Sequence, residues 1–408
     1  MTGTKTTGWF SLAVVVGALG YFVDIYDLIL FSVVRVPSLR SLGVPEDQIL
    51  STGIHLLNWQ MTGMLLGGIL WGVLGDKRGR ISVLFGSILL YSLANLANAW
   101  VQTPQAYAWL RFIAGLGLAG ELGAAITLVS EILPKEKRGL GTTIVATVGV
   151  SGAVVANLVA RHFDWRNAYI VGGVLGLALL LMRFGILESG IFKKSTGAAR
   201  RGDFSMLFTD WGRFKRYLSC VLIGLPTWFV IGVLITLSPE IAKSRGIDGV
   251  TGGNAIMYAY IGLVLGDLSS GLISQAWKSR KKVVLMFLVL TFAATVANLT
   301  VQTDVQGFYW LCLFSGFAVG YWAMFVTIAA EQFGTNLRST VATTTPNWAR
   351  GALVPIALAF QALLGRGVSH VNAAFLVGTF CVGVALLAAW GLKDTFGHDL
   401  DYLEGEIS

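Results

Sequence analysis

Charged residues are scarce in this chain, and their scarcity excludes most classes of soluble protein. Asp, Glu, Lys and Arg make up 13% of the 408 residues, whereas hydrophobic residues make up 55%. Soluble domains carry about 25% charged residues, so this chain has too few to cover a globular surface. The composition therefore argues against a soluble enzyme and against a nucleic-acid-binding protein, despite the net charge of +8.

Cysteine and histidine are also rare, with three and four residues respectively. Cys220, Cys312 and Cys381 all lie in apolar segments, and His55 stands alone, so we predict neither a disulfide nor a metal site. No glycine-rich loop followed by Lys and Ser or Thr is present, so the sequence gives no sign of ATP hydrolysis. We therefore expect a protein without a cofactor and without enzymatic activity.

Long runs without charge are what the chain has in abundance. Examples are residues 81–110, 139–160, 217–239, 283–303 and 305–330. Each run is long enough to cross the hydrocarbon core of a bilayer, which needs roughly 20 apolar residues. Because a backbone in lipid must satisfy its own hydrogen bonds, we predict an all-α integral membrane protein.

Twelve transmembrane helices are predicted, at residues 10–34, 52–75, 81–101, 105–133, 140–160, 167–187, 216–239, 254–277, 283–302, 307–333, 340–364 and 370–392. Lys and Arg orient such helices because they favour cytoplasmic loops. With the N-terminus inside, twenty of the 30 Lys and Arg residues fall in inner loops, seven in outer loops and three within helices. Both termini are therefore predicted to be cytoplasmic. The short loops suggest a bacterial inner (plasma) membrane.

The two halves of the sequence are similar to each other at an offset near 200 residues. Glu131 and Arg138 correspond to Glu331 and Arg338, at matching helix ends. A parallel repeat of this kind indicates two pseudo-symmetric six-helix halves around a central site, which is an architecture of transporters. The predicted parts are an N-terminal half at 1–192, a cytoplasmic linker at 193–215, a C-terminal half at 216–392 and a cytoplasmic tail at 393–408.

Several motifs resemble those of the major facilitator superfamily. GDKRGR at 75–80 is similar to its loop between helices 2 and 3, and RFIAGLGLAGELGAAITLVSE at 111–131 resembles its fourth helix. YFVDIYDLILFS at 21–32 resembles the first helix of phosphate and metabolite:proton symporters. LRSTVATTTPNWARGA at 337–352 and LESGIF at 187–192 resemble segments of phosphate porters and organic-ion transporters. The resemblance covers the whole chain and implies the twelve-helix fold of that superfamily and transport by alternating access.

The resemblance also implies a conformational latch between the two halves on the cytoplasmic side. In the superfamily, the Asp of the loop between helices 2 and 3 contacts the opposite half, a role that would fall to Asp76 with Arg78 and Arg80. The charged partners of this latch would be Glu131, Arg138, Glu331 and Arg338. The alternative is that these are ordinary charges that set topology. Gln275 stands where the second repeat would match Asp76, so a latch there should be weaker.

Asp24 and Asp27 are three residues apart, which places them on nearly one face of the first predicted helix. An ionised carboxylate at this depth is costly, so each should face a wet cavity, pair with a cation or hold a proton. We expect at least one of them to carry protons, and the alternative is a static pair with Arg111. Glu121 could be a second proton site or a brace between helices. Phosphate porters have Asp at that position, and this departure weakens a phosphate assignment.

Arg350 lies twelve residues after Arg338, or about 18 Å along a helix and near the middle of the membrane. A cation at this depth needs an anion, which is either a carboxylate of another helix or a substrate. The planar guanidinium suits carboxylate, sulfonate or phosphate, and we expect Arg350 to bind substrate. The cavity wall around it is predicted to include Tyr21, Asn58, Gln60, Trp228, Tyr258, Tyr321, Trp322, Asn347 and Gln361.

The sequence thus predicts a monomeric secondary active transporter that cotransports a small organic anion with protons and binds no nucleic acid. One alternative keeps the fold but carries phosphate or a neutral sugar, by symport or uniport. Another is a membrane sensor that binds a ligand without transporting it. Such sensors often add a large cytoplasmic extension, whereas only 16 residues follow Leu392 here.

Overall fold

The computed structural model describes residues 12–78, 80–121, 144–145, 147–187, 204–396 and 404. Up to residue 187 the helices are α1 (Leu12–Ser41), η1 (Glu46–Gln48), α2 (Ile49–Arg78), α3 (Arg80–Asn98), α4 (Pro104–Leu118), α7 (Gly152–His162) and α8 (Trp165–Leu187). From residue 204 they are α9 (Met206–Thr209), α10 (Trp211–Ile223), α11 (Leu225–Phe229), η2 (Val230–Ile235), α12 (Ser238–Ser244), α13 (Gly252–Trp277), α14 (Arg280–Thr300), α15 (Val305–Ala318), α16 (Trp322–Glu331), α17 (Thr335–Gly351), α18 (Leu353–Gly365) and α19 (His370–Gly391). Throughout these described ranges, every regular element is a helix.

Eight helical stretches in the described ranges are long and apolar enough to cross a membrane. They are Val14–Ser41, Trp165–Arg183, Trp211–Ile235, Gly252–Trp277, Arg280–Thr300, Val305–Glu331, Thr340–Gly365 and His370–Gly391. Helical residues also occupy part of each of the twelve predicted spans. The all-α membrane fold is therefore supported, whereas the count of twelve transmembrane helices stays a prediction.

The ends of several helices differ from the predicted ends. α1 continues through Pro37 to Ser41, past the predicted end at residue 34. α2 reaches Arg78 and α3 begins at Arg80, so most of the segment 75–80, which we predicted as a loop, has a helical backbone. Apolar runs locate the part of a helix that lies in lipid, but a helix continues into polar sequence wherever its backbone hydrogen bonds continue.

Several predicted single spans are interrupted in the structure, and three of these interruptions lie after residue 204. Gly224 separates α10 from α11, residues 319–321 separate α15 from α16, and Ala352 separates α17 from α18. Interruptions of this kind at membrane depth free backbone groups, which must then be satisfied by neighbouring helices. The break between α15 and α16 lies beside the candidate site, because Trp322 at the start of α16 contacts Arg350.

One type of helix contact occurs twice. α2 packs on α4 so closely that a Cβ atom on Gly63 would collide with the Phe112 carbonyl. α13 packs on α15 in the same way, and a Cβ atom on Gly262 would collide with the Leu313 carbonyl. Small residues allow helices in a membrane to approach at backbone distance. Gly63 and Gly262 are 199 residues apart in the sequence, which matches the offset of the internal repeat.

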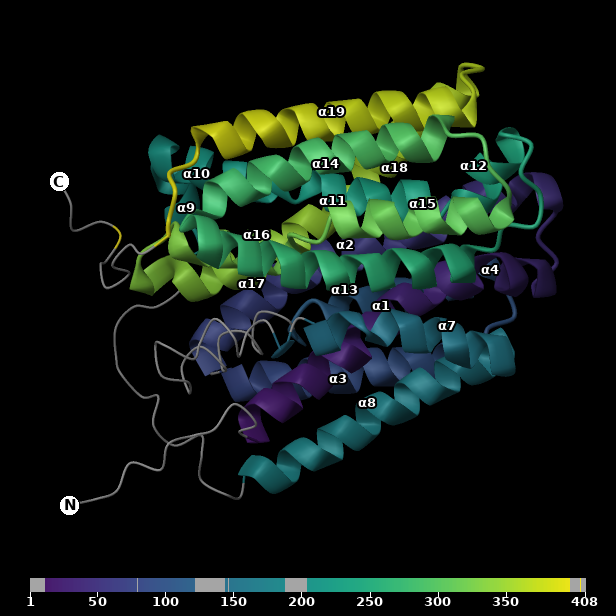
Figure 1. Ribbon diagram of the computed structural model, residues 1–408. Helices are drawn as coiled ribbons and strands as arrows, with labels where there is room; N and C mark the ends of the chain where they lie inside the picture. The colour runs from purple at the N-terminus through teal and green to yellow at the C-terminus, as the bar shows by residue number, and fades with distance from the viewer. Residues whose placement is uncertain are drawn as a thin grey trace.

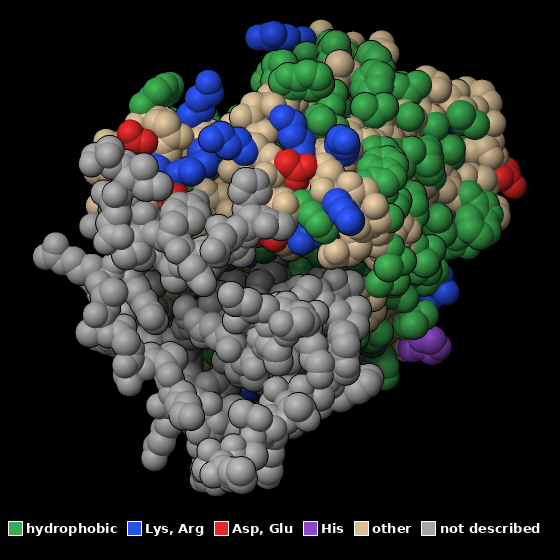
Figure 2. All heavy atoms as spheres, turned by 60° about the vertical axis from the view of Figure 1, so that its left-hand side comes forward, with side chains coloured by type: hydrophobic (Ala, Val, Ile, Leu, Met, Phe, Trp, Pro, Cys, Tyr) green, Lys and Arg blue, Asp and Glu red, His purple; other side chains and the backbone are tan. Residues whose placement is uncertain are grey.

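The helices lie side by side in one bundle, and the described start of α1 and the end of α19 lie at the same end of it (Figure 1). Lys and Arg side chains gather over the end seen in Figure 2, and hydrophobic side chains cover the flank. Large apolar residues such as Leu272, Leu387 and Trp390 are more than 70% exposed. Exposed apolar surface of this extent fits contact with lipid.

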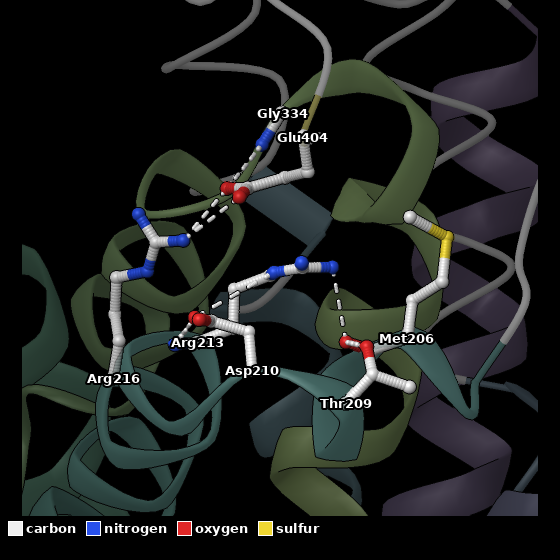
Figure 3. Close-up of polar contacts among 7 residues, drawn as sticks. All are labelled: Met206, Thr209, Asp210, Arg213, Arg216, Gly334 and Glu404. Atoms are coloured by element: carbon white, nitrogen blue, oxygen red, sulfur yellow. Dashed lines mark hydrogen bonds and ion pairs between the residues drawn. The ribbon is translucent and has the colours of Figure 1, made fainter. Parts of the chain in front are cut away.

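Polar contacts hold the start of α10 near the end of the chain. Glu404 accepts hydrogen bonds from Arg216 at 2.8 and 3.0 Å and from the Gly334 backbone at 3.3 Å (Figure 3). Asp210 caps α10 by accepting from the Arg213 backbone at 2.7 Å, as expected for Asp at a helix N-terminus. These contacts hold α10, near the start of the second part of the bundle, which comprises the helices after residue 204.

Candidate functional site

Arg350 lies at the end of α17 and is completely buried. Its Nη1 donates to the Asn347 side chain at 3.3 Å, while Nε and Nη2 have no hydrogen-bond partner among the described residues. No carboxylate among the described residues lies within ion-pair distance of the guanidinium. Buried polar groups in proteins are nearly always hydrogen-bonded, so these two free donors need an explanation.

Two indole rings flank the Arg350 guanidinium. Its Cζ atom lies 5.7 Å from the ring centroid of Trp228 on α11 and 5.7 Å from that of Trp322 on α16. The two indoles are 5.9 Å apart at an interplanar angle of 78°. The aromatic faces stabilise the buried cation without neutralising its charge. The positive charge therefore remains available to an anion.

Tyr21 connects this arrangement to α1. The Trp322 indole N–H donates to the Tyr21 hydroxyl at 3.2 Å, and both side chains are buried. Trp322 also stacks on Phe325, with ring centroids 4.9 Å apart. The orientation of the Trp322 indole is thus determined from both sides.

Asp24 and Asp27 are both completely buried on α1, and within the described part of the chain none of their four carboxylate oxygens has a hydrogen-bond partner. The positive charge of Arg350 acts on Asp24. Asp27 instead faces Arg111 and the side chain of Asn95. The two carboxyl groups, adjacent on one helix, therefore face different cations.

Arg111 on α4 makes its contacts with aromatic hydroxyl groups. Its Nη1 donates to the Tyr169 hydroxyl at 3.1 Å, and Tyr169 lies 2.6 Å from the Tyr107 hydroxyl. The described carboxylates include none within ion-pair distance of Arg111, although its charge acts on Asp27. The roles expected of Arg111 and Asp27, whether in proton carriage or as a static pair, stay predictions.

Glu121 forms a buried ion pair with Arg183 on α8. Both side chains are less than 10% exposed, so the pair is shielded from water. The pair connects the residue just after α4 to α8, which is the contact a brace would make. Arg183 was not among the predicted site residues, although a cation inside an apolar helix signals a buried partner.

The other predicted wall residues divide into two groups. Asn347 contacts Arg350 and also donates to the Ala119 carbonyl at 2.8 Å. Gln60 and Tyr321 instead bind backbone carbonyls of neighbouring helices, at 2.9 Å each. Tyr258 stacks on Tyr309 and accepts from Gln306. Among the described residues, no hydrogen bond or ring contact joins Arg350 to the side chains of Asn58, Gln60, Tyr258, Tyr321 or Gln361.

Most of the predicted latch cannot be followed in the structure. Glu131 and Arg138 lie outside the described residues, and for Asp76, Arg78, Arg80 and Arg338 only the helical backbone is described. Glu331 accepts from Arg280 at 3.4 Å and from Thr395 at 2.6 Å. These contacts join Glu331 to the start of α14 and to the chain after α19.

Sequence reasoning missed a partly buried ion pair between helices that are distant in the chain. Arg35 on α1 donates to both carboxylate oxygens of Glu240 on α12 at 2.8 Å, and only 1% of its side chain is exposed. Arg161 on α7 makes a second polar link, to Asn254 on α13. The sequence indicated only a topological charge at Arg35, because nothing in it shows which helix lies opposite.

Asp267 was also missed. It is 1% exposed on α13, and its Oδ1 accepts from the Ala323 backbone in the first turn of α16 at 3.0 Å. Its Oδ2 has no partner in the protein. An acidic residue in the middle of an apolar helix is itself a functional signal, so the sequence did contain an indication.

The sequence profile of the Major Facilitator Superfamily matches residues 17–345 of this chain. The chain belongs to the Major Facilitator Superfamily. The match confirms the predicted family. Together with the relatives below, it identifies a membrane transporter rather than an enzyme.

Three curated relatives of this superfamily member are similar along most of its length. The putative niacin/nicotinamide transporter NiaP of Bacillus subtilis is 26% identical over 345 residues, which are 80% of this chain and 82% of NiaP. A putative metabolite transport protein of Haemophilus influenzae is 27% identical over 397 residues, or 93% of this chain and 92% of that protein. The 3-(3-hydroxy-phenyl)propionate transporter of Escherichia coli is 28% identical over 349 residues, or 79% and 81%.

Proposed function

We propose that this protein is a secondary transporter that cotransports a small organic anion, preferably a ring-bearing carboxylate, with protons. The observation that supports this best is the Arg350 guanidinium, which is buried between two indoles with two free N–H donors and no carboxylate at ion-pair distance. A carboxylate can accept two parallel hydrogen bonds from such a guanidinium. The indole faces suit an aromatic ring.

The names of the relatives support the same class of substrate. Niacin and 3-(3-hydroxy-phenyl)propionate, named for two of them, each combine a carboxylate with an aromatic ring. Phosphate would leave the two indoles without a role, and a neutral sugar would leave the buried guanidinium without a counterion. We therefore favour the organic anion over these alternatives.

The electrostatic interaction of Asp24 with the same cation supports proton coupling. In a medium of low dielectric, an ionised Asp24 and a bound anion compete for the Arg350 guanidinium. A proton on Asp24 leaves the guanidinium to the anion, and loss of that proton returns the carboxylate to Arg350 and favours release. Because binding linkage is reciprocal, proton binding and anion binding then strengthen each other.

Alternating access requires that contacts between the two parts of the bundle break and form. We assign one such contact to the Arg35–Glu240 pair, which joins α1 to α12 at the end of the bundle where α1 ends. The halves that would move are residues 1–192 and 216–392. Opening this end requires that Arg35 leave Glu240 and become hydrated.

The test is uptake of radiolabelled nicotinate into proteoliposomes with and without an imposed pH gradient, acidic outside. The intact protein should take up nicotinate faster with the gradient, and Arg350→Ala should reduce uptake to the level of empty vesicles. Arg366→Ala, at an exposed position between α18 and α19, is the matched control and should retain normal uptake. Near-normal uptake by Arg350→Ala would make the guanidinium structural, and no response to the gradient would exclude proton coupling.

A further inference from the structure

The break between α15 and α16 leaves backbone donors that have no acceptor within α16, beside the candidate site. α15 ends at Ala318, and α16 begins at Trp322 after residues with non-helical backbone angles. The first N–H groups of a helix have no acceptor within the helix. Tyr321, at the N-cap position, makes no side-chain capping bond. The cap must therefore come from another part of the chain.

Asp267 supplies this cap from α13. Its Oδ1 accepts from the Ala323 backbone at 3.0 Å, and the carboxyl group is buried. The preceding residue, Gly266, lies against Gly320 in the break, where a Cβ atom on Gly320 would collide with the Gly266 backbone. The glycine contact brings the α13 backbone close enough for the short Asp side chain to reach the start of α16.

The start of α16 determines where the Trp322 indole lies. Trp322 is the first residue of the helix, so a cap that fixes this turn also fixes the origin of its side chain. The indole packs against the Arg350 guanidinium and against Trp228, and it donates to Tyr21. A chain of direct contacts thus leads from Asp267 to the aromatic wall around Arg350.

We propose that Asp267 is a positioning residue that holds Trp322 against Arg350 and thereby favours ring-bearing carboxylates over straight-chain ones. This proposal rests on the proposed function. The role requires only a hydrogen-bond acceptor at Oδ1, which accepts from the Ala323 backbone, and it involves no proton transfer. Asn can supply the same acceptor, whereas Ala cannot.

The test is equilibrium binding of labelled nicotinate, and its displacement by hexanoate, to the purified full-length chain in detergent. Asp267→Ala should raise the Kd of nicotinate about tenfold, the order expected when a charge-assisted hydrogen bond is lost, and change the Kd of hexanoate less than about twofold. Asp267→Asn should restore nicotinate binding to within about twofold of the original. Ser270→Ala, one turn away and also buried, removes a hydroxyl that bonds to the α13 backbone and should change neither constant.

A double-mutant cycle with Trp322→Phe separates positioning from general destabilisation. If Asp267 acts through the indole, Trp322→Phe alone should lower the preference for nicotinate, and adding Asp267→Ala should lower it no further. Equal loss of both ligands in Asp267→Ala, failure of Asn to restore binding, or additive effects would overturn the proposal. So would an unchanged preference in Trp322→Phe, which is measurable even if Asp267→Ala does not fold.

The proposed function fails in a different way. If the intact protein binds neither anion, or if Arg350→Ala binds both normally, the anion site itself is wrong and the role of Asp267 falls with it. If Arg350→Ala loses both anions while Asp267→Ala leaves the preference unchanged, only the positioning role is overturned.

Discussion

The two helix breaks that correspond in the internal repeat have opposite surroundings. After α4, residues 119 and 120 leave the helix and Glu121 follows, with its carboxylate in a buried ion pair with Arg183. The acidic residue of this break, Glu121, lies in the break itself, and Arg183 from α8 neutralises its charge. The result is a closed, satisfied contact between helices.

After α15, the corresponding break has Tyr321 in the place of Glu121. Its acid, Asp267, comes from α13 and caps α16, which leaves Trp322 free to face Arg350. An ion pair closes the break in the first part of the bundle, whereas the break in the second part places Trp322 against Arg350, the cation that we propose binds substrate. Asp24 and Asp27, whose carboxylate oxygens have no hydrogen-bond partner among the described residues, lie on α1. Under the proposed function, proton carriage therefore falls to the first part of the bundle and anion binding to the second.

The largest expected effect is on stability, and it distinguishes Glu121 at the first break from Asp267 at the second. Glu121→Ala leaves the buried Arg183 charge unpaired, and removal of one partner of a buried ion pair costs about 3–5 kcal/mol of stability. Asp267→Ala removes a helix cap, which costs about 1 kcal/mol. Thermal unfolding of both variants in one detergent measures the difference. Equal losses of stability would mean that the ion pair at the first break contributes no more than the helix cap at the second.

The second prediction tests the division between proton and anion sites. If one proton accompanies each anion, accumulation in proteoliposomes rises about tenfold for each unit of pH difference. Asp24→Asn should abolish this rise and retain exchange of nicotinate across the membrane, because Asn cannot release a proton. Asp267→Asn is the matched control and should retain gradient-driven accumulation. Normal accumulation by Asp24→Asn, by Asp27→Asn and by the double variant would exclude both residues as proton carriers.

The third prediction concerns the contact between the two parts. Glu240→Gln weakens the buried pair with Arg35, and loss of about 1 kcal/mol should raise the rate of thiol labelling at an introduced Asn254→Cys about fivefold. The three native cysteines are buried and provide a low background. Arg40→Gln removes an exposed pair with Glu46 next to the same helix end and should leave labelling unchanged. Equal labelling in both variants would show that the Arg35 pair does not hold this end closed.

The smallest effect is expected at the end of the second part, where Asp394 follows α19. Partial burial acts to raise the pKa of Asp394, but hydrogen bonds from Ser279 and from the Phe396 and Arg280 backbones outweigh it and lower the pKa below its usual 3.8. A lowered pKa stabilises the folded state above the usual value, and this stabilisation is lost as the pH falls through the folded-state pKa.

Asp394→Asn should therefore lower the melting temperature at pH 7 and have less effect as the pH falls below about 4. Solvent screening limits the difference to less than about 1 kcal/mol. Melting curves of both proteins across this pH range measure it. A difference that stays constant with pH would assign the effect to lost packing and not to charge.

Sequence reasoning located the individual buried charges but not their partners. Asp24, Asp27 and Arg350 stand out because a charged residue in an apolar helix is costly wherever its neighbours lie. The Glu121–Arg183 pair joins residues 62 apart, and the Arg35–Glu240 pair joins residues 205 apart. The local sequence pattern does not show which helices pack against each other, so it could not identify these partners.

The sequence by itself determined that the chain lies in a membrane, that it is helical, and which family it resembles, because lipid admits only apolar helices and the motifs are local. The tertiary structure alone decided that Arg350 meets two indoles and no carboxylate at ion-pair distance, and that Asp267 caps a helix from α13. These facts depend on packing between helices distant in the chain. A composition and a periodicity describe each helix alone, whereas a binding site is made where several helices meet.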